Sequence, residues 1–410
     1  MGDGLTRRAV ALGRVQTGEG VAAVLHKGLN GLLLSDLGWT PEGEVIERNF
    51  LRDAISPLPH QMGRKLMDVT FGFELKSGPA AGARPEWSPL MRAAGMSETI
   101  SATVTSIRTA ALRWVVSAAG AGIFYVELIA GGDPSLTDPK TVRENGQDMI
   151  RGTSIPALNP GQFFYGTHGA DALGFNTIYA RLTDDADPDS KALAYVETVS
   201  AGVSIIYTFR DTGFEFGTFD IYIDGLLIHV VDAIVDITGI QFNAGASAIV
   251  QARLRGAYET PTSVTLPTLV NYQSHIPARA ASMAFTIDGY ALGTIPSFSI
   301  NFGNQIAERR DVNSPNGYKG SRLVSRAPVG QLQMEQEIVA TFPAFARWDA
   351  ATVMVWSAVL GSAGTRITMT SPGVQFTSIR SADIGGIRGW DVGLKFSQPA
   401  SVKELTLTLD

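Results

Sequence analysis

An acidic stretch carries the residues of this chain that are most suggestive of chemistry. Asp185, Asp187 and Asp189 occupy alternate positions, and carboxylates at positions 1, 3 and 5 of a loop can converge on Ca²⁺. Ser190 stands where a calcium loop needs glycine, and Val196 stands where it needs glutamate. The main interpretation is therefore a solvated acidic turn, and a calcium site formed by the three aspartates is the alternative.

The other reactive residue types form no catalytic pattern. The chain has no cysteine, and its five histidines are more than thirty residues apart from one another, so zinc spacing is missing. Neither a Gly-x-Ser-x-Gly elbow nor a phosphate-binding Gly-Lys-Ser/Thr loop occurs. We therefore expect no enzyme activity and no cofactor. The histidines are read as surface or structural residues: His26, His60, His168, His229 and His275.

Aromatic residues in the same part of the chain allow a second interpretation. Aromatic faces beside acids and amides can stack on sugars, but aromatics in a small domain are more often core residues. Pairs of acids there could also serve a glycan hydrolase. Glycan binding and glycan hydrolysis therefore stay open as alternatives. The aromatics concerned are Phe163, Phe164, Tyr165, Phe175 and Tyr179.

The elements that hold these residues are expected to be strands. Apolar and polar residues alternate with period 2 in many segments, which is typical of antiparallel strands with one buried face. The pattern predicts an all-β sandwich or barrel with two short helices, at 85–94 and 343–353, and a small β-rich insertion. The clearest alternating segments are 219–224, 250–255, 298–302, 392–396 and 405–409.

Charge is distributed unevenly along the chain. The whole sequence has 33 basic and 39 acidic residues, a net charge of −6. Ten acids and four bases lie between residues 127 and 190, so this segment accounts for the whole net charge. The asymmetry predicts a separate acidic, solvent-facing unit on a neutral body. The lack of a basic excess argues against a nucleic-acid binder.

The N-terminus shows no targeting signal. Its apolar run, Ala9 to Leu12, is too short for the core of a signal peptide. No stretch of the sequence has the 18 apolar residues of a membrane-spanning helix. Residues 1–20 contain three arginines and several glycines, which predicts a mobile arm that orders only against a neighbouring subunit.

The order of segments in the body resembles bacteriophage major tail tube proteins of long-tailed, siphovirus-like phages. The resemblance covers residues 20–105 and 200–410 through many weak segments, without one diagnostic motif. The block from 106 to 199 departs from the minimal form. The segments that carry the resemblance are 48–52, 69–75, 87–95, 204–207, 223–229, 233–237, 242–245, 254–258, 295–304, 309–313 and 325–330.

The resemblance implies a domain plan. Residues 1–20 would form a flexible N-terminal arm, and residues 21–105 together with 200–410 would form a discontinuous tail tube β-sandwich. Residues 106–199 would form an inserted acidic decoration domain on the outer wall. The polar, glycine-bearing segment 307–321 is expected to be a long loop that reaches the next ring. Residues assigned to assembly on this basis are Arg309, Arg310, Asp311, Asn313, Gly317 and Arg326.

The resemblance also implies a function. The subunit would be a structural virion protein, made in the bacterial cytoplasm, that self-assembles into rings, usually hexameric, which stack around a channel for DNA. Its partners would be further copies of itself, a tape measure protein and tail terminator or tip proteins, while phage DNA passes without specific binding. The alternative is a tail-tip or adhesin module whose insertion binds a host-surface glycan.

Overall fold

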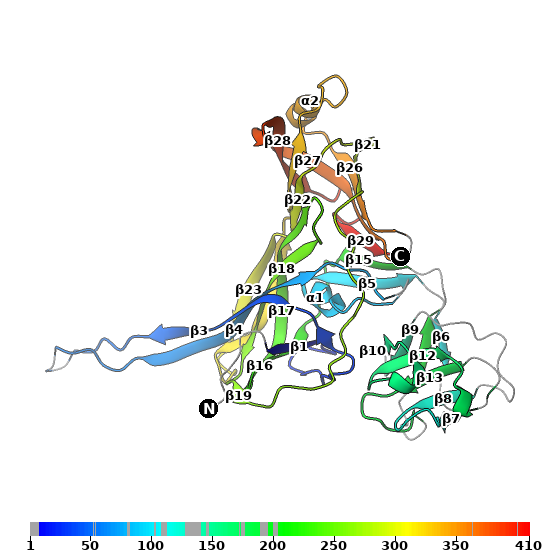
Figure 1. Ribbon diagram of the computed structural model, residues 1–410. Coiled ribbons are helices and arrows are strands. Elements are labelled where there is room, and N and C mark those ends of the chain that lie inside the picture. Colours follow the sequence, from blue (N-terminus) through cyan, green and yellow to red (C-terminus); the bar gives the residue numbers. More distant parts are fainter. Residues whose placement is uncertain are drawn as a thin grey trace.

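The structure is a computed structural model. It describes residues 8–51, 53, 55–79, 83–101, 104–107, 113–127, 141–144, 147–171, 173, 177–188, 196–199, 204–362, 364–399 and 401–410. The molecule is an all-β protein in which nearly all strands pair antiparallel, with two short helices, as the alternation in the sequence predicts. Figure 1 shows a tapering body with a long two-stranded projection on one side and a smaller β unit below it.

An 18-stranded sheet system forms the body. Its elements up to residue 263 are β1 (Ala9–Val15), β2 (Gly31–Leu32), β3 (Ser35–Ile46), β4 (Gln61–Glu74), α1 (Ser88–Ala93), β5 (Met96–Ser101), β15 (Ser204–Phe209), β16 (Gly217–Ile223), β17 (Leu226–Asn243), β18 (Ile249–Tyr258) and β19 (Thr262–Ser263). The elements after residue 280 are β20 (Ala284–Ile287), β21 (Tyr290–Ala291), β22 (Ser297–Asn301), β23 (Asn304–Arg310), β24 (Tyr318–Arg326), β25 (Val329–Glu335), α2 (Ala344–Asp349), β26 (Met354–Leu360), β27 (Ile367–Ile384), β28 (Ile387–Phe396) and β29 (Thr406–Leu409). Of these, β23 and β24 form a separate two-stranded sheet.

The two halves of the body repeat one pattern of strand pairing. In the first half, β1 pairs with β2 and β16, β16 with β17, β17 with β18 and β19, and β4 with β18 and β3. In the second half, β20 pairs with β21 and β26, β26 with β27, β27 with β28 and β29, and β25 with β28 and β22. A helix follows β4 in one half and β25 in the other. We call residues 8–263 the first repeat and residues 284–409 the second repeat.

The repeats also agree in length and register. β17 and β27 each have 18 residues, and β18 and β28 each have 10. A β-bulge separates the pairs Gly217–Ala233 and Phe219–Val230 in the first repeat. The second repeat interrupts its ladder at the same place, next to Met354–Val374. The repeats are therefore two versions of one architecture.

The repeats are joined within the chain by two strand pairings. The last four residues of β17 pair with β22, and β15 pairs with β29. One hydrophobic core runs through both repeats. Trp356 lies at its centre in the second repeat, with ring centroids 5.3 Å from Phe298 and 5.5 Å from Phe396.

Residues 104–199 form two further sheets outside the body sheet (Figure 1). The chain leaves the body at Ser101 and returns at Ser204, and these two residues oppose each other in the pairing of β5 with β15. The unit contains its own buried clusters around Phe163 and Tyr179. Its elements are β6 (Val104–Ile107), β7 (Arg113–Val116), β8 (Phe124–Glu127), β9 (Thr141–Glu144), β10 (Gln147–Asp148), β11 (Ile150–Arg151), η1 (Ile155–Ala157), β12 (Gln162–Gly166), η2 (Gly169–Asp171), β13 (Thr177–Arg181) and β14 (Val196–Val199).

This unit touches the body at a close backbone contact. A Cβ atom on Gly28 would lie 2.3 Å from the Pro160 carbonyl oxygen, so only glycine fits there. Asn271 spans the contact, because its Nδ2 donates to the carbonyl oxygens of Gly28 at 3.1 Å and Pro160 at 2.7 Å. The unit is therefore held against the body by main-chain groups as well as by its two connections.

The N-terminal segment differs from expectation. Residues Ala9–Val15 are strand β1, paired along its whole length with β16, and Val10, Ala11 and Leu12 are buried. The prediction of a mobile arm is wrong for this part, because a short apolar run without clear periodicity can form a strand when both its faces meet protein. Residues 1–7 lie outside the described residues.

The predicted helices are present but shorter than expected. α1 covers Ser88–Ala93 and α2 covers Ala344–Asp349. The α1 helix ends at Ala93, and Gly95 follows the C-cap residue Ala94 with a φ of 91°, which glycine adopts at little cost. The predicted strands around 219–223, 250–254, 298–301, 392–396 and 406–409 are confirmed.

Candidate assembly surfaces

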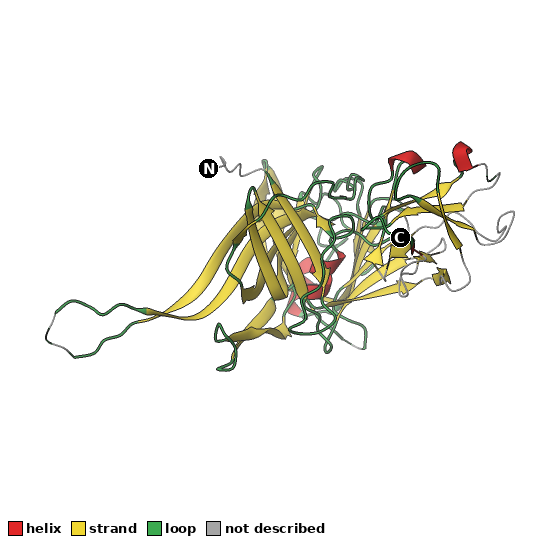
Figure 2. Ribbon diagram, turned by 90° about the horizontal axis from the view of Figure 1, so that it is seen from below, coloured by secondary structure: helices red, strands yellow, loops and turns green. Residues whose placement is uncertain are grey.

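A long β-hairpin projects from the body, and we call it the arm (residues 35–74). β3 and β4 pair from Ser35 and Gly72 near the body out to Ile46 and Gln61, and both figures show this ribbon extending well past the other strands (Figure 1, Figure 2). Most side chains of β3 are exposed. A strand so little covered by its own subunit is suited to contact with another chain.

Apolar side chains gather at the end of the arm. Phe50 is 68% exposed, and Leu51 and Ile55 are fully exposed. Val45 and Ile46, where β3 ends, are also exposed. Such a cluster at the end of a projecting hairpin cannot be buried by the subunit's own core, which marks the tip as a contact surface.

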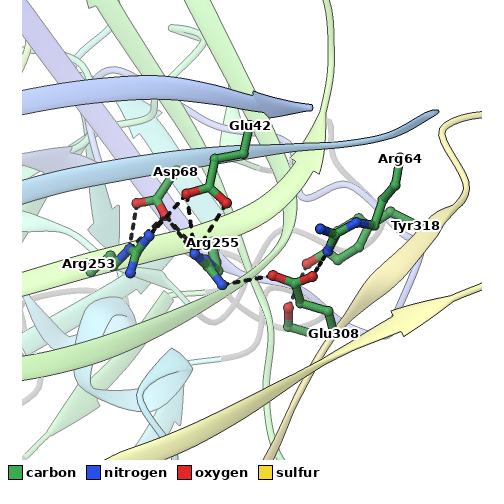
Figure 3. A network of polar contacts seen from close by, with 8 residues as sticks. Glu42, Arg64, Asp68, Arg253, Arg255, Glu308 and Tyr318 are labelled. Carbon is green, nitrogen blue, oxygen red and sulfur yellow. Dashed lines mark hydrogen bonds and ion pairs between the residues drawn. The ribbon is translucent and has the colours of Figure 1, made fainter. Parts of the chain in front are cut away.

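An ion-pair network fixes the root of the arm (Figure 3). Asp68 of β4, 5% exposed, accepts hydrogen bonds from Arg253 Nε at 2.6 and 2.8 Å and from Arg255 Nε at 3.2 Å. Glu42 of β3 accepts from both arginines, at 3.2 Å from Arg253 and 3.3 Å from Arg255. The hydrogen bond to Asp68 is the main reason that the pKa of Arg253 is raised. A buried carboxylate with two guanidinium partners resists rotation of the arm about its root.

The network continues onto the hairpin formed by β23 and β24. Arg255 Nη1 donates to Glu308 Oε1 at 2.8 Å, and Glu308 also contacts Arg64 of β4. Figure 3 shows this chain of contacts running from Glu42 through Arg255 and Glu308 to Arg64. The polar face of β4 and β18 is thus covered by the β23–β24 hairpin. The arm root therefore lies between β18 of the first repeat and the β23–β24 hairpin of the second repeat.

The segment 307–321 is therefore not the long loop that the sequence suggests. Its ends belong to β23 and β24, which pair from Asn304–Arg326 to Arg310–Tyr318, and only residues 311–317 form the connection. Polar residues and glycines occur here because the hairpin packs through ion pairs and hydroxyl contacts. Tyr318, for example, is buried and lies 2.7 Å from the Ser321 hydroxyl.

The residues assigned to assembly mostly have partners inside the subunit. Arg309 contacts Glu19 and donates to the Lys319 carbonyl oxygen at 3.1 Å. Arg310, 67% exposed at its side chain, lies 3.5 Å from Glu44 of the arm. These contacts attach the β23–β24 hairpin to the first repeat.

The connection 311–317 is a tight turn held by local hydrogen bonds. The backbone N–H of Asn313 donates to Asp311 Oδ1 at 2.9 Å, and that hydrogen bond is the largest cause of the lowered pKa of Asp311. Gly317 has a φ of 65°. Val312, which lies between Asp311 and Asn313, is fully exposed. The turn therefore presents a small surface next to the arm.

Arg326 is a structural residue of the body. Its side chain is 10% exposed, lies over the Phe209 ring at 4.6 Å, and pairs with Glu404 and, at 2.8 Å, with Asp211. Asp211 also pairs with Lys403, and that contact is the main cause of the lowered pKa of Asp211. Arg326 thus joins the end of β24 to segments just before β16 and β29.

The acidic stretch does not form a cation cage among the described residues. Arg181 donates to both carboxylate oxygens of Asp185, at 2.7 and 3.0 Å, so this carboxylate has a cationic partner. Asp187 is partly exposed, and Asp189 lies outside the described residues. Groups of three or more potential ligands are missing from the part of the chain that the structure describes.

The aromatics considered for sugar stacking are core residues where the structure describes them. Phe163 and Tyr179 are buried, at 1% and 0% exposure, and Phe164 and Tyr165 pack against the same clusters. Their strand positions explain this, because neighbouring residues of β12 and β13 pack into two different buried clusters on opposite faces of the sheet. Phe175 lies outside the described residues. The alternative interpretation of these aromatics as a sugar-stacking surface is therefore wrong for Phe163 and Tyr179, which are not accessible to a ligand.

Sequence reasoning missed the arm and its network. Arg253 and Arg255 were visible on the polar face of an alternating strand, but their acidic partners Glu42, Asp68 and Glu308 come from distant segments. Charges at alternate positions of a central strand could have signalled partners across the sheet. The identity of those partners depends on strand order, which alternation does not reveal.

Comparison with known families gives one informative match. The model described as "Phage tail tube protein" matches residues 6–387. No curated protein matches the chain. No helix in the described part of the chain is long and apolar enough to cross a membrane. The match runs from just before β1 to the start of β28 and covers nearly the whole chain, so the chain belongs to the phage tail tube protein family, a structural family of the virion tail.

Proposed function

We propose that copies of this subunit assemble into closed rings that stack into the tail tube, the conduit through which a long-tailed phage delivers its DNA. Family membership supports self-association in the tail. The observation that carries the proposal is the arm, whose apolar tip at Phe50, Leu51 and Ile55 is left exposed by its own subunit. We assign this tip to the contact between successive rings.

The sheet shared by the repeats supports a channel wall. One face of β17, β22 and β25 packs on the core, and the other carries mainly neutral side chains that form a shallow hollow. Neutral amides and hydroxyls attract DNA phosphates less than lysine and arginine do. We assign this face to the channel, where DNA passes without specific binding. Its residues are Gln241, Asn243, Ser297, Ser299, Gln331, Gln333 and Asp391.

The unit at 104–199 is assigned to the outer wall. Its two sheets and separate clusters lie outside the body sheet, and a folded unit of this size inside the channel would obstruct DNA. We propose that 106–199 is an inserted decoration domain. Its acidic charge would give the outside of the tube a negative surface that opposes association between tails.

Further partners follow from the same proposal. Tail terminator and tip proteins would meet the free ends of the tube, and a tape measure protein would occupy the channel during assembly. The exposed turn from Arg310 to Asn313, together with Gly317, lies beside the arm and is proposed as a second contact with a neighbouring ring. Arg309 and Arg326 would act indirectly, by fixing the hairpin on the body.

Electron microscopy of the purified full-length protein tests the proposal. The wild type is expected to form tubes or stacked rings. The variant Phe50→Ser, Leu51→Ser, Ile55→Ser should remain as single rings or subunits with an unchanged melting temperature, because these side chains contribute nothing to the core. Leu269→Ser with Val402→Ser is the matched control, since both residues are exposed apolar residues outside the arm. Tubes of normal length from the arm-tip variant, or a wild type that never assembles, would overturn the proposal.

A further inference from the structure

The junction between the repeats shows how two units of this architecture join. Ile240, Gln241, Phe242 and Asn243 at the end of β17 pair antiparallel with Ile300, Ser299, Phe298 and Ser297 of β22. The Phe242 and Phe298 rings stack with centroids 5.9 Å apart. The end of the long strand of one unit thus accepts the edge strand of the next unit.

The equivalent strands at the two outer ends of the body have free edges. β3 holds the place of β22, and among the residues that the structure describes it pairs only with β4. The last four residues of β27, from Ser381 to Ile384, pair with β28 on one side, and the described residues supply no strand for the other side. The subunit therefore carries both halves of the same junction without their partners: the β3 edge on the first repeat and the β27 end on the second repeat.

We propose that β3 of one subunit pairs antiparallel with the end of β27 of a second copy, and that this junction closes the ring. The inference rests on the proposed function, because it concerns ring assembly. An exposed edge strand is a site of nonspecific pairing unless something covers it, and a second copy carries the matching edge. The contact is heterologous, with different surfaces on the two subunits, so it can continue around a ring until it closes.

The register follows from the repeat. Ser381–Ile384 and Ile240–Asn243 are the last four residues of strands of equal length. Ser297 opposes Gln333, and Ser35 opposes Gly72, the equivalent position on β4. Ser35 therefore corresponds to Ser297, and Trp39 to Ile300. The intermolecular pairs are Ser35 with Ile384, Gly38 with Ala382, and Trp39 with Ser381.

Local features of β3 agree with this register. Ser35 and Trp39 are exposed in the subunit. Pro41, two residues later, has no N–H and is tolerated in a strand mainly at a sheet edge. The ladder with the neighbour would thus occupy the segment before Pro41, and the remainder of the arm would continue past the neighbour towards the next ring.

The repeat also changes the expected number of subunits. Each subunit supplies two units to the ring, so a ring of six units would contain three subunits in place of the six subunits that the resemblance implies. The junction between repeats inside a chain and the junction between chains would then alternate around the ring.

Disulfide cross-linking tests the register directly, because the chain has no cysteine of its own. Directly opposed residues on antiparallel strands have Cα atoms about 4.5–5.5 Å apart, which suits a disulfide. Assembled S35C/I384C protein should form, on oxidation, a ladder of covalent oligomers that ends at three subunits on a non-reducing gel. The equivalent pair within the chain, N243C/S297C, should oxidise without joining subunits. S35C/R380C, about 13 Å out of register, should cross-link at least tenfold less.

Mixing single-cysteine variants gives the direction of the contact. S35C mixed with I384C should yield dimers only, and neither variant alone should cross-link. Dimers from S35C alone would mean that two β3 strands pair with each other, which overturns the inference. Tubes that form normally without an S35C/I384C cross-link would also overturn it while leaving the proposed function intact. A protein that never assembles would overturn both.

Discussion

The two repeats share a pattern of strand pairing but treat their first hairpin differently. In the first repeat the hairpin β3–β4 projects as the arm, with most of β3 exposed. In the second repeat the corresponding stretch, β22 to β25, has its strands paired on both sides near the body, and its outer part, β23–β24, lies against the first repeat through Glu308, Arg309 and Arg310. The second repeat thus shows within one chain the pairing that we propose for the first repeat with another copy.

The comparison also separates stability from assembly. A residue in the junction inside the chain contributes to folding of the subunit, while in the proposed assembly its equivalent in the first repeat contributes to contacts between subunits. Exposure reflects this difference, since Ile300 is fully buried and Trp39 is 38% exposed. Variants at equivalent positions should therefore differ in which equilibrium they change.

The largest effect is expected at this matched pair. Ile300→Ala should lower the free energy of unfolding of the subunit by about 4 kcal/mol, because it leaves a cavity in the core. Trp39→Ala should change it by less than about 0.5 kcal/mol but should weaken ring formation. Urea unfolding of the unassembled subunit and sedimentation of assembled protein measure the two quantities. Equal loss of subunit stability in both variants would contradict the comparison.

A second prediction concerns the buried carboxylate at the arm root, Asp68, which has no acidic counterpart in the second repeat. Val329 takes the position of Asp68 there. Asp68→Ala should destabilise the subunit by about 3 kcal/mol, because Arg253 and Arg255 lose a buried carboxylate partner. Val329→Ala, at an exposed residue, is the control and should have little effect. Thermal unfolding measures both, and limited proteolysis should show a more accessible arm only in Asp68→Ala.

A third prediction concerns how the second repeat's hairpin is held down. Glu19 pairs with Arg309 and, at 2.6 Å, with Arg322. These side chains are partly exposed, so Glu19→Gln should cost only about 1 kcal/mol. Hydrogen exchange should nevertheless rise at Tyr318–Arg326 and stay unchanged in β27. Equal protection of the hairpin in variant and wild type would show that its packing does not depend on Glu19.

The sequence alone predicts the strands well but not the repeat. Alternation located β16, β18, β22, β28 and β29, since each has one face in a shared core. Equivalent positions carry unlike residues, such as Ile300 and Trp39 or Asp68 and Val329, because one member meets its own chain and the other meets solvent or a charge. Sequence self-similarity was therefore weak, and only strand pairing reveals the duplication.

The candidate site was less predictable for the same reason. The segment 307–321 suggests a reaching element because it is polar and contains glycines, but those residues serve ion pairs and a tight turn. The true projection, 35–74, alternates only partly, because neither face of its outer part is buried by the subunit. Periodicity reports burial within one chain, so it fails at surfaces that are covered by another copy.

The smallest effect is expected at a cross-strand pair that differs between the repeats. Asp220 opposes His229, with its carboxylate 2.5 Å from His229 Nδ1, whereas Ser357 opposes Thr370 at the equivalent place. The hydrogen bond to Asp220 is the largest cause of the raised pKa of His229. A histidine whose pKa is higher in the folded state stabilises the fold below its unfolded pKa of 6.5, and this contribution disappears as the pH rises through the folded pKa.

Asp220→Asn should therefore lower the free energy of unfolding at pH 5.5 by about 1 kcal/mol, a value reduced by the partial exposure of the pair. The loss should be smaller at pH 8.5, because the contribution of the pair declines as the pH rises through the raised folded-state pKa of His229. Ser357→Ala in the second repeat is the control, since this pair has no titrating group and its effect should not depend on pH. Urea unfolding at the two pH values measures the difference. An Asp220→Asn effect that is the same at both pH values would mean that the pair acts through packing rather than charge, and that the two repeats do not differ in this respect.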